Sequence, residues 1–107
     1  MIDPDERLFA AIADPTRRQL VMTLAENSPR TATQLAEEFP ITRQGIIKHL
    51  DLLAKAGLVR VQTYGREKRY WLAPEALNRV SSWIDDVGTK WEERLQRLKN
   101  FVESEES

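Results

Sequence analysis

The sequence predicts a mainly α-helical domain that carries one small β-hairpin. Apolar residues recur at spacings of three and four over most of the chain, as they do on amphipathic helices. The spacing changes to strand-like alternation only around residues 58–72, on either side of Gly65. The 107 residues are enough for one domain, and no internal repeat or low-complexity segment is visible.

The first two helices are expected to begin with the same pair of residues, Asp3-Pro4 and Asp14-Pro15. Asp caps a helix N-terminus, and Pro at the first helical position lacks an N–H that would have no partner there anyway. We expect helices over Pro4 to Ile12 and Pro15 to about Ala25, followed by a break at residues 27–29. Their inward sides consist of Leu8, Phe9 and Ile12, and of Leu20, Val21 and Leu24.

Two further helices, separated by a tight turn, form a predicted helix-turn-helix over residues 31–57. Either Thr31 or Thr33 caps the first of them, and Pro40 ends it. Thr42 caps the second, and Gly57 is a suitable left-handed residue to end it. One apolar stripe on this second helix must pack inward: Ile46, Leu50 and Leu53.

The opposite side of that helix carries groups that suit DNA. Gln44 and Lys48 lie nearly opposite the stripe, and Gly45 and Ile47 flank it. An amide, a small residue and a cation fit base edges and phosphates in a major groove. Taken alone, the same pattern also fits an ordinary amphipathic helix with a solvated polar face.

A cationic hairpin follows directly and favours the DNA-binding interpretation. We expect strands over residues 58–62 and 68–72, joined by a turn over residues 63–67. Four cations gather on this predicted wing: Arg60, Arg66, Lys68 and Arg69. The chain has a net charge of −1, yet residues 43–73 alone carry +5 and the segments on either side carry −3 each. The positive charge is therefore concentrated on the two elements expected to touch phosphate.

After Ala73-Pro74 a long amphipathic helix is expected over residues 74–103. Gly88 is a weak point that bends or divides it, and the acidic end from Glu103 is expected to fray. We interpret its apolar stripe as a dimer interface, with the first helix alongside. The interface residues are Leu8, Trp83, Val87, Trp91, Leu95 and Leu98. Two alternatives are that the helix folds back onto its own domain, or that Trp83 and Trp91 line a small-molecule pocket.

Several classes of protein are disfavoured. The chain has no cysteine and one histidine, and it shows neither a GxGxxG motif nor a phosphate-binding loop, so we expect neither an enzyme nor a cofactor. No apolar signal segment opens the sequence, and a cytoplasmic protein without a membrane span is expected, associated with the nucleoid when bound to DNA. His49 either holds the helix-turn-helix together or acts as a charged group. Arg17 and Arg18 either touch phosphate or pair with acids.

The whole pattern resembles the ArsR family of winged-helix transcriptional repressors over essentially the full length. The resemblance is carried by ADPTRRQL (13–20), QLAE (34–37), TRQGIIKHL (42–50), LAKAGLV (53–59) and YGREKRYWL (64–72).

This resemblance implies a homodimer joined through the first and last helices and bound to an inverted-repeat operator in double-stranded DNA. It also implies the DNA-binding residues, which are Thr42, Arg43, Gln44, Gly45, Ile47, Lys48, Arg66, Lys68 and Arg69. Many members sense metals through cysteine or histidine, which the third and terminal helices here lack, so we expect a metal-independent branch with no metal site. The alternatives for function are a winged helix that binds proteins, and a small-molecule-responsive regulator with a pocket near the terminal helix.

Overall fold

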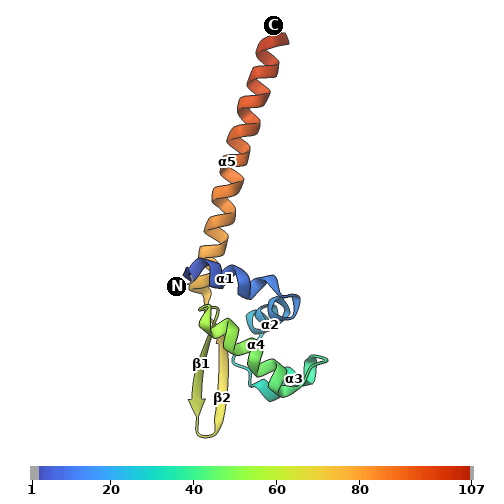
Figure 1. The fold of residues 1–107 in the computed structure, drawn as a ribbon, viewed down its shortest axis with the longest axis vertical. Helices are drawn as coiled ribbons and strands as arrows, with labels where there is room; N and C mark the ends of the chain where they lie inside the picture. Colours follow the sequence, from blue (N-terminus) through green and yellow to red (C-terminus); the bar gives the residue numbers. More distant parts are fainter. Residues whose placement is uncertain (1–2, 107) are drawn as a thin grey trace. The chain divides into compact units, whose positions relative to one another are not determined.

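The computed structural model describes residues 3–106, which form five helices and two strands (Figure 1). The elements are α1 (Pro4–Ala13), α2 (Pro15–Glu26), α3 (Ala32–Glu38), α4 (Arg43–Lys55), β1 (Val59–Tyr64), β2 (Glu67–Leu72) and α5 (Pro74–Glu106). The chain divides into two units, residues 1–77 and 78–107. The predicted class, mainly helical with one antiparallel hairpin, is confirmed.

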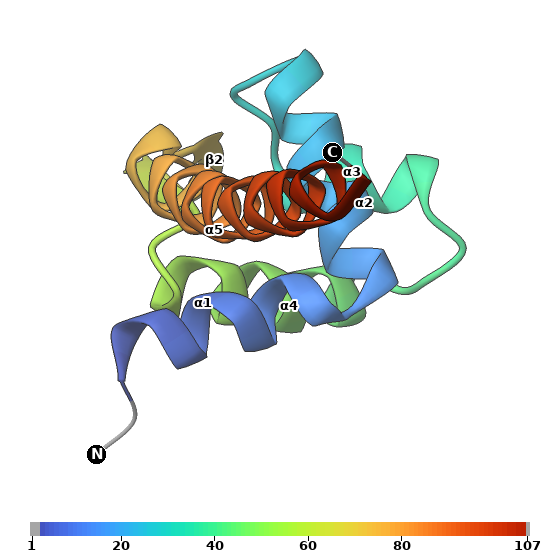
Figure 2. The same ribbon diagram turned by 90° about the horizontal axis from the view of Figure 1, so that it is seen from above.

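The core of the first unit consists mainly of leucines and alanines, with one isoleucine, one valine and one tyrosine, and it extends from α1 to the start of α5. Helix α1 lies alongside α4, as Figure 2 shows, and both contact α2. Among the described residues no polar or charged side chain is buried, so the core is held by apolar burial alone. The largest fully buried side chains are Leu8, Leu20, Leu24, Leu35, Ile46, Leu50, Leu53 and Leu58.

The helix N-termini are capped as the sequence predicts. Asp3 and Asp14 each accept a backbone N–H bond in the first turn of their helix, at 2.9 and 3.0 Å. Thr31, rather than Thr33, caps α3, and it forms a reciprocal capping box with Gln34. Thr42 Oγ1 caps α4 by accepting the N–H of Gly45 at 3.1 Å.

The hairpin has a shorter turn than predicted. Tyr64 pairs with Glu67, so only Gly65 and Arg66 connect the strands, and the predicted five-residue turn is wrong. Gly65 has a φ of 62°, the positive value that the first central residue of a two-residue hairpin turn adopts in type II′. Because Thr63 and Tyr64 are good strand formers, the β1 ladder continues through them to the tip.

The base of the hairpin is tied to the helix-turn-helix. Tyr70 is buried, and its backbone N–H and C=O exchange hydrogen bonds with those of Arg30 at 2.9 and 3.1 Å. The Arg30 side chain also pairs with Glu38 on α3 at 2.6 Å. Ala73 donates to the carbonyl of Leu58 at 2.8 Å and closes the end of the ladder. The wing is therefore held at its root by backbone bonds.

Helix α5 is continuous over 33 residues. The predicted division at Gly88 is not observed, because one glycine costs only about 1 kcal/mol in a helix interior and the helix continues through it. The predicted fraying from Glu103 is also not observed as far as Glu106; Ser107 lies outside the described residues. No helix of the described chain is both long enough and apolar enough to cross a membrane.

The second unit presents its apolar side chains to solvent. Eight of them are between 44% and 60% exposed within the single chain: Trp83, Ile84, Val87, Trp91, Leu95, Leu98, Phe101 and Val102. Leu8, the remaining residue predicted for a dimer interface, is only 1% exposed because it lies in the core of the first unit. Little of its surface is left for a second chain.

Candidate nucleic-acid interface

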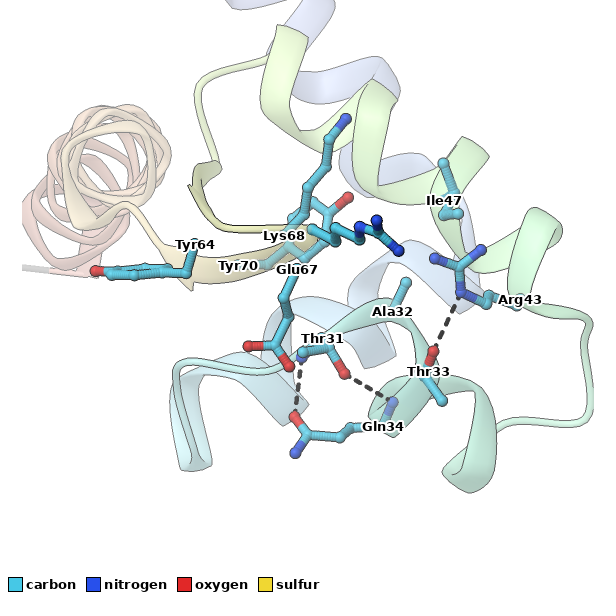
Figure 3. A pocket seen from close by; sticks show the side chains of 11 residues that line it. Thr31, Ala32, Thr33, Gln34, Arg43, Ile47, Tyr64, Glu67, Lys68 and Tyr70 are labelled. Carbon is cyan, nitrogen blue, oxygen red and sulfur yellow. Dashed lines mark hydrogen bonds between the residues drawn. The ribbon is translucent and has the colours of Figure 1, made fainter.

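The N-terminal half of α4 presents the predicted base-reading residues. Arg43, Gln44 and Lys48 are exposed, and Ile47 is half-buried. Arg43 Nε donates to Thr33 Oγ1 at 3.1 Å, which holds the guanidinium at the junction of α3 and α4 (Figure 3). These side chains leave the same end of α4, where the helix N-terminus also favours anions.

Thr42 and Gly45 form the turn that starts this helix. The Thr42 hydroxyl accepts the Gly45 N–H. A Cβ at position 45 would lie 3.4 Å from Thr42 Oγ1 and 3.7 Å from Ile41 Cβ, which is ordinary van der Waals contact. The turn therefore does not require glycine for packing, and we expect Thr42 and Gly45 to act in the interface by setting the start of α4.

A groove of about 690 Å³ lies between α3, the start of α4 and the hairpin. We call it the wing groove. Three cations line it: Arg43 from α4, Arg66 from the turn and Lys68 from β2. Figure 3 shows Ile47 and Arg43 on α4 facing the groove, across from Lys68 and Tyr70 of the hairpin. The one acid in the lining is Glu67.

Alternation along β2 gives the hairpin two different faces. Lys68 and Tyr70 line the wing groove, whereas Arg69 and Trp71 alternate with them and point to the other side. On that outer face Arg69 Nε donates to Glu67 Oε2 at 2.8 Å, and its guanidinium lies 4.4 Å from the centre of the Tyr64 ring. Arg69, predicted to bind DNA, is thus engaged within the hairpin itself.

Tyr64 connects the outer face into one cluster. Its hydroxyl donates to Gln62 Oε1 at 2.8 Å, and its ring lies 6.4 Å from that of Trp71. Together with Arg69 and Glu67, these residues link both strands through side-chain contacts. We call Tyr64, Glu67 and Arg69 the outer clasp; Tyr64 and Glu67, next to the turn, also line the edge of the wing groove. Strand alternation could have indicated this cluster. In the observed register one face of the hairpin carries residues 62, 64, 67, 69 and 71.

Tyr70 remains a neutral hydrogen-bonding group at the floor of the wing groove. Burial raises the pKa of its phenol, the negative charge of Asp51 raises that pKa further, and Arg43 acts in the opposite direction. A phenol that stays protonated does not repel phosphate. Neither Tyr70 nor Thr33 was predicted as part of the site, because only the tertiary pairing of Arg30 with Tyr70 brings α3 and β2 together.

The side chains of Arg17 and Arg18 bind backbone carbonyls at the end of α1, a role that neither of the two interpretations included. Arg17 donates to the carbonyls of Ala11 and Ala10 at 2.7 and 3.2 Å. Arg18 donates to those of Ile12 and Ala13 at 2.7 and 3.0 Å. The two arginines of α2 therefore satisfy the last four carbonyls of α1, which have no partner within their own helix.

His49 is half-buried and lies next to Arg17. Its Nδ1 is 3.4 Å from Arg17 Nη1. This contact joins α4 to α2, as the first of the two interpretations of His49 predicts. Asp14 lies close by, and the backbone N–H of Arg17 lowers the pKa of its carboxyl, with further lowering by the charges of Arg17 and His49. No group of three or more His, Cys, Asp or Glu side chains converges in the described part of the chain.

A helix-turn-helix joined to a cationic wing defines the DNA-binding regulators of transcription. A family model described as a helix-turn-helix domain matches residues 12–62. The chain is 31% identical to the HTH-type transcriptional regulator Rv2034 of Mycobacterium tuberculosis, over 94% of this chain and 90% of that protein. It is 32% identical to the transcriptional repressor SdpR of Bacillus subtilis, over 72% and 84%.

Among solved structures, an ArsR-like transcriptional regulator from Rhodococcus sp. RHA1 matches with a TM-score of 0.84 and 35% identity. That match covers 94% of this chain and 92% of the other. The protein belongs to the ArsR family of winged helix-turn-helix transcriptional regulators, and the resemblance predicted from the sequence is confirmed.

Proposed function

We propose that the protein is a homodimeric repressor that binds an inverted-repeat operator through α4 and the wing. The observation that carries the proposal is the convergence of Arg43, Arg66 and Lys68 on the wing groove, beside the exposed start of α4. These cations come from separate elements and face the same space. Such an arrangement suits a duplex whose major groove receives a helix while its backbone passes the wing.

Each residue is assigned a role by its position. Arg43, Gln44, Ile47 and Lys48 lie where base edges would be reached, and Ile47 offers an apolar contact to a thymine methyl group. Arg66 and Lys68 would contact phosphates, which fixes the register of the protein on the duplex. Thr42 and Gly45 shape the turn, and Arg69 orders the wing from its outer face.

The dimer is supported by the exposed stripe of α5. Soluble monomers rarely leave such a run of large apolar side chains in water, and a second chain would cover it. Two α4 helices in one dimer would read two half-sites about 34 Å apart, which is one helical turn of DNA. Repression is supported by relatives that are known as repressors, among them SdpR and the arsenical resistance operon repressor of Bacillus subtilis. Such a protein would act in the cytoplasm, on the nucleoid.

The test is fluorescence anisotropy with DNA from upstream of the protein's own gene, at several salt concentrations and with a scrambled duplex as competitor. The variant is Arg66→Ala with Lys68→Ala. Its matched control is Lys90→Ala with Arg97→Ala, which removes one lysine and one arginine from exposed positions on α5.

We expect the unmodified protein to prefer its operator by about a thousandfold or more. The wing variant should bind every duplex more weakly, and its salt dependence should be shallower by about one unit per lost phosphate contact. The control pair should leave both quantities unchanged. Unaltered binding by the wing variant would contradict the assignment of Arg66 and Lys68.

A further inference from the structure

A second groove, of about 720 Å³, lies between α1 and α4 on the first unit. We call it the α1–α4 groove. Its volume is within the range of sites that hold small organic ligands. The lining residues are of two kinds, apolar (Ala10, Ala11, Leu52) and charged (Glu6, Arg7, Arg17, Lys55).

Of the apolar lining residues, Ala11 belongs to the core, whereas Ala10 and Leu52 are exposed. Leu52 is 46% exposed, although it lies on the same helix as the fully buried Ile46, Leu50 and Leu53. Across from it, the apolar side chains that α1 contributes are the small ones of Ala10 and Ala11, which leave the space unfilled. A hydrocarbon chain placed here would cover Leu52 and remove apolar surface from water.

The charged part favours an anion. Arg7, Arg17 and Lys55 contribute three positive charges from three helices, against the single carboxylate of Glu6. Arg7 and Lys55 are exposed, so their charges are carried at the edge of the groove. A ligand with an anionic head and an apolar tail is complementary to both parts, and a carboxylate can accept bidentate hydrogen bonds from an arginine.

Arg17 connects this groove to the recognition helix. Its Nε and Nη2 bind carbonyls of α1, and its Nη1 is 3.4 Å from His49 Nδ1. His49 directly follows Lys48, one of the residues assigned to DNA. A carboxylate that binds Arg17 would compete with the His49 ring for the same guanidinium. Occupancy of the groove would therefore change the contact that holds α4 to α2.

We propose that the α1–α4 groove binds an amphipathic organic anion, a carboxylate with a short hydrocarbon tail, and that its occupancy changes the affinity of the protein for DNA. The binding half of this proposal is independent of the proposed function, and the DNA half rests on it. No residue of the wing groove takes part in the α1–α4 groove, so the two sites can be altered separately.

The test is isothermal titration of the full chain with sodium octanoate, with 1-octanol as the uncharged probe of equal tail length. We expect one saturable site per chain for octanoate, at least tenfold weaker binding of 1-octanol, and at least tenfold weaker octanoate binding by Leu52→Glu. The matched control is Met22→Glu, which places the same charge at a 61% exposed apolar position on α2 outside the groove. It should bind octanoate as the unmodified protein does.

A second variant, Lys55→Ala, should weaken octanoate binding and leave that of 1-octanol unchanged, which separates the role of charge from loss of the fold. Absence of a saturable octanoate site at millimolar concentration overturns the proposal, and so does equal binding by Leu52→Glu. If Leu52→Glu instead changes the sedimentation mass, the groove is a contact between two copies and the proposal fails.

The same octanoate concentrations are then added to the protein–DNA anisotropy titration. A shift in DNA affinity that Leu52→Glu abolishes supports the coupling. Octanoate binding without any such shift overturns it. If the protein binds no specific DNA at all, the proposed function fails, while the calorimetric result on the groove still stands.

Discussion

At the scale of single residues, α1 and α2 are joined by two arginines of α2 that bind the C-terminus of α1. Helix α1 has no basic residue in its last turn, and Arg17 and Arg18 of the next helix supply the donors for its last carbonyls. Cations near a helix C-terminus also interact favourably with the helix dipole. The ADPTRR segment therefore works as a C-cap for one helix and an N-cap for the next.

Arg18→Ala should lower the free energy of unfolding by about 0.5–1 kcal/mol. Two carbonyls of α1 lose their side-chain donor, and the favourable interaction between the Arg18 charge and the dipole of α1 is lost. Urea unfolding followed by circular dichroism measures this. The control is the neighbouring Gln19→Ala, since Gln19 is exposed and its side chain has no such role. Equal stability of the two variants would show that the Arg18 bonds contribute nothing.

Asp14 gives a pH dependence with a definite sign. The backbone N–H of Arg17 is the main cause of the lowered pKa of this carboxyl, so the folded state prefers the ionised form. Its stabilising contribution is complete above the pKa of Asp in the unfolded chain, and it is lost as the pH falls through the lower folded value. Asp14→Asn should keep the cap and remove this part of the acid-dependent loss.

Thermal unfolding at a series of pH values below about 6 tests this expectation. The two proteins should differ in the acid limb of the curve and run parallel near neutrality. Asp85→Asn, at an exposed position on α5, is the control, and it should follow the unmodified protein. An identical acid limb for Asp14→Asn would show that Asp14 does not titrate differently in the two states.

Residue-scale features were predictable where they depend on local sequence and not where they depend on the fold. Asp3, Asp14 and Thr42 cap their helices because capping needs only neighbouring backbone N–H groups. The bonds of Arg17 to α1 and to His49 span 6 and 32 residues. Spacing in sequence carries no sign of such contacts, so both roles considered for Arg17 missed them.

At the scale of elements, the two faces of the hairpin carry different side chains with different expected roles. Its inner face carries Lys68 toward the wing groove, and its outer face carries the clasp of Tyr64, Glu67 and Arg69, of which Tyr64 and Glu67 also reach the edge of the groove near the turn. An isolated two-stranded hairpin is only marginally stable in water, so side-chain contacts across its strands matter to its shape. The clasp is expected to keep the tip ordered, with Arg66 and Lys68 presented together.

A double-mutant cycle tests this role of Arg69. Arg69→Ala and Tyr64→Leu should each weaken DNA binding, and the double variant should be no weaker than the more damaged single variant. The reason is that Arg69 would act through Tyr64, so its effect disappears once the ring is gone. Arg69→Lys should recover part of the loss, because an ammonium group can also lie over a tyrosine ring.

Additive losses in the cycle would contradict the positioning role and favour direct contact of Arg69 with phosphate. The salt dependence gives an independent measurement, because a direct phosphate contact in the Tyr64→Leu background would still contribute about one unit of slope per site. The matched control is Arg60→Ala. Arg60 lies on the same face of the hairpin as Arg69, but it pairs with Glu75 and does not contact Tyr64.

Element boundaries show what the pattern of a sequence can and cannot specify. Helix α4 has a capping threonine at its start and Gly57, with a φ of 81°, directly after its last turn, and both ends were predicted. The hairpin turn was predicted too long because the turn signal of Gly65 was extended over Thr63, Tyr64 and Glu67, which pair in the ladder. Gly88 was given too much weight, since one unfavourable residue does not interrupt a long helix.

At the scale of the whole molecule, the distribution of charge was the most informative property. The segment 43–73 carries +5 in a chain of net charge −1, and three of its seven cations, Arg43, Arg66 and Lys68, line the wing groove. The motif order along the chain then led to the family. What could not be predicted is spatial: the backbone pairing of Arg30 with Tyr70 and the groove between α1 and α4 exist only once the helices pack.

The exposed stripe of α5 leads to the prediction that concerns the assembly as a whole. Val87→Glu places a charge in the stripe. Thr89→Glu is the matched control: it also replaces a β-branched residue by glutamate, two positions away and on the other side of the helix. In a dimer joined through α5, a glutamate at position 87 would have to be buried or the interface would open, because an unpaired charge is costly away from water. Sedimentation should give a monomer for Val87→Glu and a dimer for Thr89→Glu.

DNA binding should follow the same division. A dimer engages its second half-site at a high effective concentration, so a monomer should bind the operator about a hundredfold more weakly or worse. Thr89→Glu should keep operator affinity within a small factor of the unmodified protein. If Val87→Glu stays dimeric and binds DNA normally, the dimer interface does not include this stripe. If the unmodified protein is a monomer that still binds its operator tightly, a single chain is sufficient for binding, and each half-site is recognised independently.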